Sequence, residues 1–577
     1  MTLERRRGGR KWVPLVSVAV AYVMIATLLP NPLRIPTDEA TATAEFAPVV
    51  GKRTNQSGGS LSETGFASSE GLGSGGDGLG EFGLGLDNPL AQLPSPVSRP
   101  RQKTCYGDPP RQAEDPLSPP CVAFFEGDNG GATYPGVTGD KVTAVMYDGL
   151  SDIPDGEDMC KPYSDEDSLS TRTLKAMQNY FQKRYQTYGR RVCIVKQADS
   201  GVEDVNRKGD AIKTVQEYNP FAVMSFAEPN DDEYLKQISK QGVTSFGLNF
   251  FQPQSYYEQN SPLAFSFFDT REEHAEITAA YICEKLIKNK VTHTDDPTLR
   301  GQTRRVGLIY NTGAESAGGE DMAPEIKRRA KQKCGFEFAA EFKYPYDATT
   351  SGGAGNSQAI ADMRNKNINT VFMMSYADAI LLAQQTASNS AYFPEWFVNS
   401  TSVLDVGPVA RVFSDPRQKT FGVSLRWRTP GIRETFWYQA YQSEQPNTLA
   451  EARWGFSWYY LLLNLFTAVQ AAGPKLTPDA IARGMFTFKT DQLDNPYVPS
   501  GEYGEPADYA FVSSYMEFFW DPRGTPPDGN PSEGCVRVTN EGRRFRPGGV
   551  GSDESGLFNP ASPCTADIRL LQDGVGA

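Results

Sequence analysis

Histidine is nearly absent from this chain of 577 residues, and the shortage narrows the chemistry open to it. Only His274 and His293 occur, and neither stands in an H-x-x-x-H or H-E-x-x-H spacing, so a histidine-rich metal centre has no support. A G-x-S-x-G nucleophile elbow and a P-loop are also missing. We therefore expect a protein that is not an enzyme, with no metal and no cofactor.

Positive charge is also in deficit. The chain has 57 Lys and Arg residues against 70 Asp and Glu residues, a formal net charge of -13. An acidic surface repels phosphate backbones, which argues against nucleic acid as a partner.

The exception is the N-terminus, where basic residues (Arg5, Arg6, Arg7, Arg10 and Lys11) precede an uncharged apolar run from Trp12 to Leu29. A helix of that length spans about 27 Å, the thickness of a bilayer core. Basic residues before the run hold the N-terminus inside, so the rest of the chain is exported. Residues 1–30 are thus predicted to be a signal anchor or a cleaved signal peptide. The protein is then extracytoplasmic, tethered to the membrane or, after cleavage, secreted.

Residues 31–124 are rich in Gly, Ser and Pro, and we predict a disordered tether there. None of the eight cysteines forms C-x-x-C, a pattern that suits structural disulfides in an oxidising compartment. Two pairs are close enough in sequence to staple loops, Cys105 with Cys121 and Cys535 with Cys564. The other pairings stay open, and Cys283 and Cys334 can equally be buried free thiols.

From residue 138 onward, short apolar strands alternate with amphipathic helices. Strands are expected at 141–147, 191–195, 221–227, 243–249 and 264–269, and the alternation restarts with strands at 306–310, 336–342, 371–376, 396–399 and 420–427. Such alternation predicts parallel, doubly wound sheets. We therefore expect an α/β protein with lobe 1 at 125–270, lobe 2 at 271–430, return segments to lobe 1 and closing strands at 431–545, and a tail at 546–577.

The most apolar folded segment is 449–473, which is long enough to suggest a second membrane span. Arg453, Ser457 and Asn464 interrupt it, and Gly473-Pro474 ends it, so a buried helix returning to the first lobe is the better interpretation. Near the end of the chain, 515–520 and 535–539 alternate like an antiparallel strand pair.

The stretch from Gly130 to Val142 (GGATYPGVTGDKV) resembles the opening of type 1 periplasmic binding proteins. These are the substrate-binding components of branched-chain amino acid type ABC transporters, in which a G-V-T-x-D-x-I phrase leads into the first strand. The strand VGLIY at 306–310, the return helix and the closing strand pair are also similar. The resemblance covers roughly residues 125–545 and implies a two-lobed fold that closes on a small solute. The long tether, the missing lipobox and the cysteine-containing tail depart from it.

In open α/β sheets, ligands bind beyond the carboxyl ends of the strands. The residues that follow or end the predicted strands carry hydroxyl, amide and aromatic groups, which suit a polar or amphipathic ligand. The predicted ligand-binding residues are Tyr147, Ser225, Phe226, Ala227, Asn249 and Phe250 in the first lobe and Tyr310, Asn311, Ser375, Tyr376 and Asp378 in the second. The resemblance implies that Ser225 and Ala227 hold a ligand carboxylate, and that Tyr310 and Asp378 engage its other end.

Three functions compete. The first is capture of a small-molecule solute between the lobes and its delivery to an ABC transporter permease. The second is a ligand-binding sensor or scaffold subunit of a membrane complex on the same fold. The third, an exported enzyme, has no motif in its favour.

Overall fold

The computed structural model describes residues 105–566, with gaps at 107–108, 113–114, 150, 202, 227–231, 249–250, 314–317, 348–349, 412–414, 452–453, 505–507 and 528–533. The predicted N-terminal membrane segment and most of the predicted tether lie outside the described residues. Among the described helices, none is both long and apolar enough to cross a membrane.

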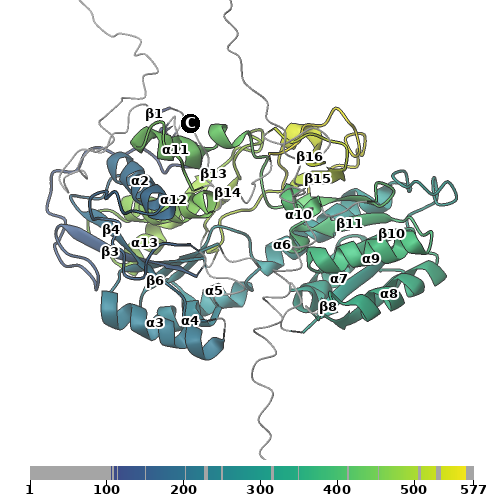
Figure 1. Ribbon diagram of the computed structural model, residues 1–577, viewed down its shortest axis with the longest axis horizontal. Coiled ribbons are helices and arrows are strands. Elements are labelled where there is room, and N and C mark those ends of the chain that lie inside the picture. Colours follow the sequence, from purple (N-terminus) through teal and green to yellow (C-terminus); the bar gives the residue numbers. More distant parts are fainter. Residues whose placement is uncertain are drawn as a thin grey trace, which may run out of the picture. The chain divides into compact units, whose positions relative to one another are not determined.

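The first sheet contains five parallel strands in the order β4-β3-β5-β6-β7. They are β3 (Lys141–Asp148), β4 (Arg191–Gln197), β5 (Ala222–Phe226), β6 (Thr244–Gly247) and β7 (Ala264–Ser266). Figure 1 shows helices on both sides of it, with α2 (Leu169–Arg184), α12 (Gly455–Ala472) and α13 (Pro478–Met485) on one and α3 (Asp204–Tyr218), α4 (Asp232–Lys240) and α5 (Gln254–Asn260) on the other. The apolar run at 449–473 thus forms α12, which packs on α2, β5 and β6.

Local sequence explains where α2 begins and ends. The Ser168 side chain accepts a hydrogen bond from the Thr171 N–H at 3.1 Å, which caps the first turn. Lys183 and Arg184 in the last turn complement the helix dipole. The apolar spacing of the sequence continues beyond this helix, because the side chains of Tyr185 and Tyr188 are also buried after the last helical turn.

The second sheet contains seven strands in the order β16-β15-β12-β11-β10-β8-β9. The parallel strands are β8 (Val306–Thr312), β9 (Ala340–Pro345), β10 (Thr370–Met374), β11 (Glu395–Asn399) and β12 (Lys419–Ser424). β15 (Met516–Asp521) pairs antiparallel with β12 and with β16 (Cys535–Val538), so the predicted closing pair is confirmed and completes this sheet. The described part is therefore an α/β fold with two sheets in which parallel pairs dominate.

Alternate residues of β10 enter two different cores. Val371 and Met373 pack with α8 (Gly353–Asn365) and α9 (Ala377–Asn389), whereas Phe372 and Met374 pack with α6 (Arg271–Glu284) and α7 (Gly319–Cys334). Successive side chains of a strand point to opposite faces, so a strand covered on both sides reads as one continuous apolar run. The sequence VFMM in β10 has this form.

The remaining elements are short. They are β1 (Cys105–Tyr106), β2 (Arg111–Gln112), β13 (Lys489–Thr490), β14 (Gly501–Glu502), α10 (Gly407–Ala410), α11 (Phe436–Glu444), and the 3-10 turns η1 (Leu286–Lys288), η2 (Ser400–Ser402), η3 (Ile432–Glu434) and η4 (Thr539–Gly542).

The folded part of the chain begins before residue 124, inside the range that was predicted as a tether. Residues from β1 onward are held by the Cys105–Cys121 disulfide and packed on the first lobe. Leu117 is buried in the core, and the Tyr185 hydroxyl donates to the Asp115 carboxylate at 2.8 Å. The segment's Pro-rich composition is typical of disorder, but the disulfide and these distant partners fix it.

All eight cysteines are paired in four disulfides. Two confirm the predicted loop staples, Cys105–Cys121 and Cys535–Cys564, and the others are Cys160–Cys193 and Cys283–Cys334. Cys283 and Cys334 are therefore not free thiols.

Candidate functional site

A row of residues crosses the carboxyl edge of the first sheet. Strand register aligns Tyr147 with Gln197 on one side and with Ser225 on the other, and continues through Gly247 to Ser266. Ser225 is buried at this edge. Two of the five aligned residues carry hydroxyl groups on short side chains, which suit polar recognition.

Tyr147 points into the layer of α3 and α4 rather than out of the edge. Its hydroxyl donates to Asp210 Oδ2 at 2.7 Å and accepts from Arg207 Nη1 at 2.8 Å, and its ring stacks on Tyr234 with centroids 3.6 Å apart. Burial raises the pKa of Tyr147. The Tyr147 side chain is therefore fully buried between the sheet and the helices α3 and α4, where it stabilises the end of β3.

Three of the predicted first-lobe residues cannot be placed. Ala227, Asn249 and Phe250 lie outside the described residues, and for Phe226 only the strand backbone is described. Their role in binding stays a prediction. Phe251 lies in the loop between β6 and α5 and has a positive φ of 63°. This backbone conformation is unusual for a bulky residue.

The second sheet ends in a connected polar cluster. Ser375 Oγ donates to Asn311 Oδ1, and Asn311 Nδ2 donates to the Tyr344 carbonyl at 3.4 Å. The Tyr344 hydroxyl in turn donates to Asn356 Oδ1, and Asn356 Nδ2 donates to the Ala379 carbonyl at 3.0 Å. The network thus joins the ends of β8, β9 and β10 to α8 and α9.

Two other predicted residues stand beside this cluster at the surface. The Tyr346 hydroxyl donates to Asp378 Oδ2 at 2.7 Å, and the Tyr346 ring lies 5.1 Å from that of Tyr376. Tyr376 is 36% exposed, so an aromatic face is open next to the hydrogen-bonding groups. The structure therefore brings Asn311, Ser375, Tyr376 and Asp378 together.

Tyr310 faces a different way. Its ring belongs to the core formed with α6 and α7, and its hydroxyl donates to Glu341 Oε1 at 2.9 Å. Burial raises the pKa of Tyr310 to about 12, so the group is neutral at physiological pH. Because neighbouring residues of a strand point to opposite faces, Tyr310 and Asn311 cannot both join the polar cluster.

Sequence reasoning missed an acidic group near the end of β11. Asp405 Oδ2 accepts from Ser424 Oγ at 2.6 Å and from Ser400 Oγ at 3.0 Å, and Arg426 lies 3.5 Å from Asp405 Oδ1. Val403, two residues earlier, has a φ of 56°, which is strained for a β-branched residue. Asp405 lies six residues after the end of β11, in a stretch whose sequence is typical of an ordinary turn. The sequence therefore gave no reason to single it out.

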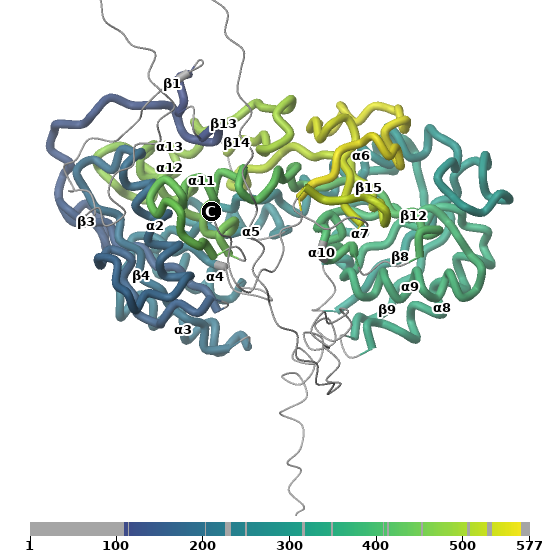
Figure 2. The backbone as a smooth tube through the Cα atoms, turned by 45° about the horizontal axis from the view of Figure 1, so that its top comes forward, coloured from purple at the N-terminus to yellow at the C-terminus, as the bar shows by residue number. Residues whose placement is uncertain are grey.

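Three segments connect the two sheets, at 267–270, 425–431 and 508–515. The first and third are paired by backbone hydrogen bonds, Phe511 N–H to the Ser266 carbonyl and Val512 N–H to the Phe267 carbonyl, both at 3.1 Å. The second and third are joined by Arg544, whose guanidinium donates to the Leu425 carbonyl at 2.8 Å and Ser514 Oγ at 2.8 Å. In Figure 2 the C-terminal segment that carries Arg544 is the yellow tube beside β15.

The chain is similar in structure to type 1 periplasmic binding proteins. The solved structures include a solute-binding protein of an ABC transporter from R. palustris in complex with 4-hydroxybenzoate (12% identity, 73% of this chain and 100% of that chain covered, TM-score 0.49). Others are a periplasmic binding protein type 1 from Bordetella pertussis Tohama I (13%, 68% and 100%, 0.46) and a leucine-binding protein from Thermotoga maritima MSB8 (10%, 70% and 99%, 0.46).

No family model matches the chain, and no curated protein matches it.

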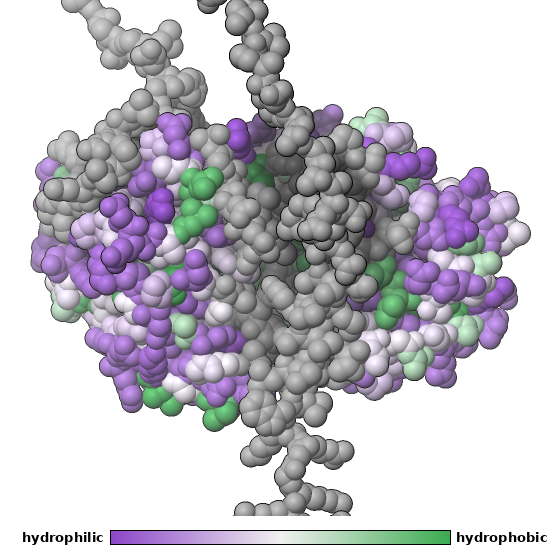
Figure 3. All heavy atoms as spheres, viewed as in Figure 1, coloured by the Kyte–Doolittle hydropathy of each residue, from purple (hydrophilic) through white to green (hydrophobic). Residues whose placement is uncertain are grey.

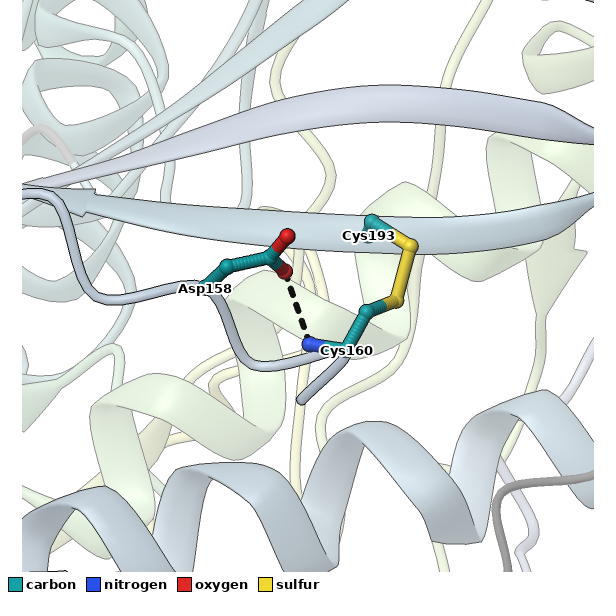
Figure 4. Close-up of side chains that lie close together, drawn as sticks. All are labelled: Asp158, Cys160 and Cys193. Atoms are coloured by element: carbon teal, nitrogen blue, oxygen red, sulfur yellow. Dashed lines mark hydrogen bonds between the residues drawn. A yellow bond between two sulfur atoms is a disulfide. The ribbon is translucent and has the colours of Figure 1, made fainter. Parts of the chain in front are cut away.

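One group in the described part of the chain has the composition of a metal site. Ligand atoms of Asp158, Cys160 and Cys193 lie within 4.8 Å of one another. Figure 4 shows that the two sulfur atoms are bonded to each other and that the Asp158 carboxylate accepts from the Cys160 N–H, at 2.8 Å. Metal ligation needs free thiolates, so the group is a disulfide-closed turn.

Proposed function

We propose that the chain is an extracytoplasmic solute-binding protein that captures a small polar or amphipathic solute between its two lobes and delivers it to an ABC-type permease. The observation that carries the proposal is the pair of mostly parallel sheets, each with polar residues at the carboxyl edge of its parallel strands. Such edges bind ligands in open α/β folds, and two of them joined by three connections permit hinge closure.

The second-lobe cluster supports the choice of solute. Asn311 and Ser375 are fully buried and bonded to each other, so they hold the strand ends in place, while the half-buried Asp378 carboxylate and the exposed Tyr376 ring lie at the surface. A solute with a polar end and a small apolar body matches these groups. The four disulfides support an oxidising, extracytoplasmic compartment.

The test begins with native mass spectrometry of the full-length protein, to detect a co-purified small molecule. That molecule, or each member of a solute library, is then tested for thermal stabilisation, which a ligand of the native state must produce. The Ser375→Ala variant should weaken binding about tenfold, because Asn311 Oδ1 loses its hydrogen-bond partner at the strand ends beside the site. Ser357→Ala is the control, since that hydroxyl donates to the Gly353 carbonyl within α8.

If no solute in a broad library stabilises the protein, the capture proposal is wrong. Delivery is tested separately, by adding the loaded protein to the reconstituted permease and measuring ATP hydrolysis. Saturable binding without stimulation of ATP hydrolysis would favour the sensor or scaffold function instead.

A further inference from the structure

A pocket of about 180 Å³ is lined in part by the second connecting segment, and none of its lining residues belongs to the polar cluster at the ends of β8–β10. We call it the crossover pocket. Six of its ten lining residues are aromatic, and the ten are Trp427, Thr429, Pro430, Glu434, Thr435, Phe436, Trp437, Phe456, Tyr460 and Tyr497. They come from the connecting segment, η3, the first turns of α11 and α12, and the loop between β13 and β14.

The aromatic walls hold one another in place. The Trp427 ring lies 5.5 Å from that of Phe456 and 4.9 Å from that of Tyr460, and the last two are 4.8 Å apart. Trp437 packs so closely on Gly455 that a Cβ there would lie 2.6 Å from its ring. Walls fixed in this way lose little conformational entropy when a ligand enters.

The size of the pocket suits one aromatic ring. An apolar cavity of roughly 150 Å³ stays dry and takes up benzene, so a space of about 180 Å³ holds a ring with one or two small substituents. Flat rings pack well against a wall of other rings, by offset stacking or edge contacts.

Charges around the pocket set the charge of the ligand. Glu434 is exposed at the lining, and its carboxylate makes no hydrogen bond or ion pair with the described residues. A negative group there repels carboxylates and accepts hydrogen bonds. The Arg428 guanidinium lies over the Tyr497 ring, 5.4 Å from its centroid, and disfavours a second cation at that wall.

We propose that the crossover pocket is a second binding site, for a neutral single-ring aromatic compound that bears a hydroxyl or N–H donor. The ring stacks among the six aromatic side chains, and the donor bonds the Glu434 carboxylate. None of the lining residues belongs to the strand-end cluster of Asn311, Ser375, Tyr376 and Asp378, so this site is tested independently of the solute-capture function.

On the face seen in Figure 3 the coloured surface is mostly hydrophilic, and the apolar residues form small, scattered patches. Among the described residues, the large exposed hydrophobic side chains (Val122, Val205, Ile212, Tyr376, Val403 and Leu449) lie outside the pocket lining. A concave pocket with six aromatic walls is therefore a distinct feature of the described surface.

The test uses the full-length protein and three probes of matched shape, p-cresol, toluene and 4-methylbenzoate. Binding is measured by isothermal titration and by quenching of tryptophan fluorescence, to which Trp427 and Trp437 contribute. We expect p-cresol to bind most tightly, toluene about tenfold more weakly because it has no donor, and 4-methylbenzoate most weakly of all. The absence of saturable p-cresol binding would overturn the proposal.

Variants locate the site. Glu434→Ala should bring the affinity for p-cresol to within about twofold of that for toluene, and should strengthen 4-methylbenzoate binding. Phe436→Ala should weaken p-cresol and toluene about fivefold, through loss of one wall. Glu434 is exposed, so its variant tests the proposal even if Phe436→Ala fails to fold.

Val205→Ala is the control, because this side chain is 74% exposed on α3 and lies outside both sites, and it should leave p-cresol binding unchanged. Tyr376→Ala removes an exposed ring from the strand-end site and tests the alternative location. If Tyr376→Ala abolishes p-cresol binding and Glu434→Ala does not affect it, the ring binds at the strand ends and the crossover pocket is not the site.

Discussion

Replacing Arg544 with methionine should destabilise the protein strongly, because one guanidinium satisfies groups from two connecting segments. Arg544 is only 2% exposed. It donates to the carbonyls of Leu425, Arg426 and Ser514 and to the Ser514 hydroxyl. Burial lowers the pKa of Arg544 to about 9, so the side chain is still charged at neutral pH.

The magnitude follows from the groups left behind. Methionine fills the volume but donates nothing, so three carbonyls and a hydroxyl lose a partner. Each buried unpaired group costs about 1–3 kcal/mol, and entry of water offsets part of the sum. We expect the free energy of unfolding to fall by about 3–5 kcal/mol, and by less in Arg544→Lys, which keeps the charge.

Urea unfolding of the full-length protein, followed by circular dichroism and tryptophan fluorescence, measures the effect. The neighbouring Arg543 provides the control, because its ion pair with Asp494 joins side chains that are 67% and 83% exposed. Arg543→Met should change stability by less than about 0.5 kcal/mol. A loss below about 1 kcal/mol in Arg544→Met would refute the view that this residue joins the connecting segments.

Three further predictions test other parts of the structure. Burial raises the pKa of Asp508 to about 6 in the native state, so the native state binds this proton more tightly than the unfolded state does. The free energy of unfolding should therefore rise as the pH falls from 7 to 5. Asp508→Asn should reduce that rise, as measured by unfolding across this pH range. Tyr147→Phe should cost about 1–3 kcal/mol in urea unfolding, because Arg207 and Asp210 lose a buried hydroxyl partner; unchanged stability would contradict the described network. Replacing the Cys535–Cys564 disulfide, of sequence separation 29, with two serines should cost about 3–4 kcal/mol, and thermal unfolding with and without reductant would show whether the bridge forms.

Most strand positions could be read from the sequence with small errors, although the strand expected at 336–342 is β9 at Ala340–Pro345. The prediction at 221–227 corresponds to β5, Ala222–Phe226, and that at 306–310 corresponds to β8, Val306–Thr312. Buried parallel strands are short apolar runs between turn residues, so local composition defines them. β11 begins one residue early, at Glu395, because a buried ion pair with Arg304 at 2.8 Å lets a charged residue enter the sheet.

The arrangement of the candidate site was harder to predict from the sequence. Sequence identifies which residues end a strand, but not which face each side chain takes or what it meets there. Tyr147 and Tyr310 are the last residues of two predicted apolar strands. Both side chains point inward and bond partners that are distant in the sequence, Asp210 and Glu341. Asn311 and Ser375 meet because the ends of adjacent parallel strands lie side by side, which strand order alone suggests.

The order of strands in the second sheet has a consequence during synthesis. β12 ends at Ser424, and its antiparallel neighbour β15 begins at Met516, about 90 residues later. At about 5–20 residues per second, the ribosome needs roughly 5–20 s to supply that partner. Throughout this interval the nascent chain presents the edge of β12 without its final neighbour, and unpaired edges invite association with other chains. A chain with this strand order therefore depends on protection of that edge until the last strands emerge.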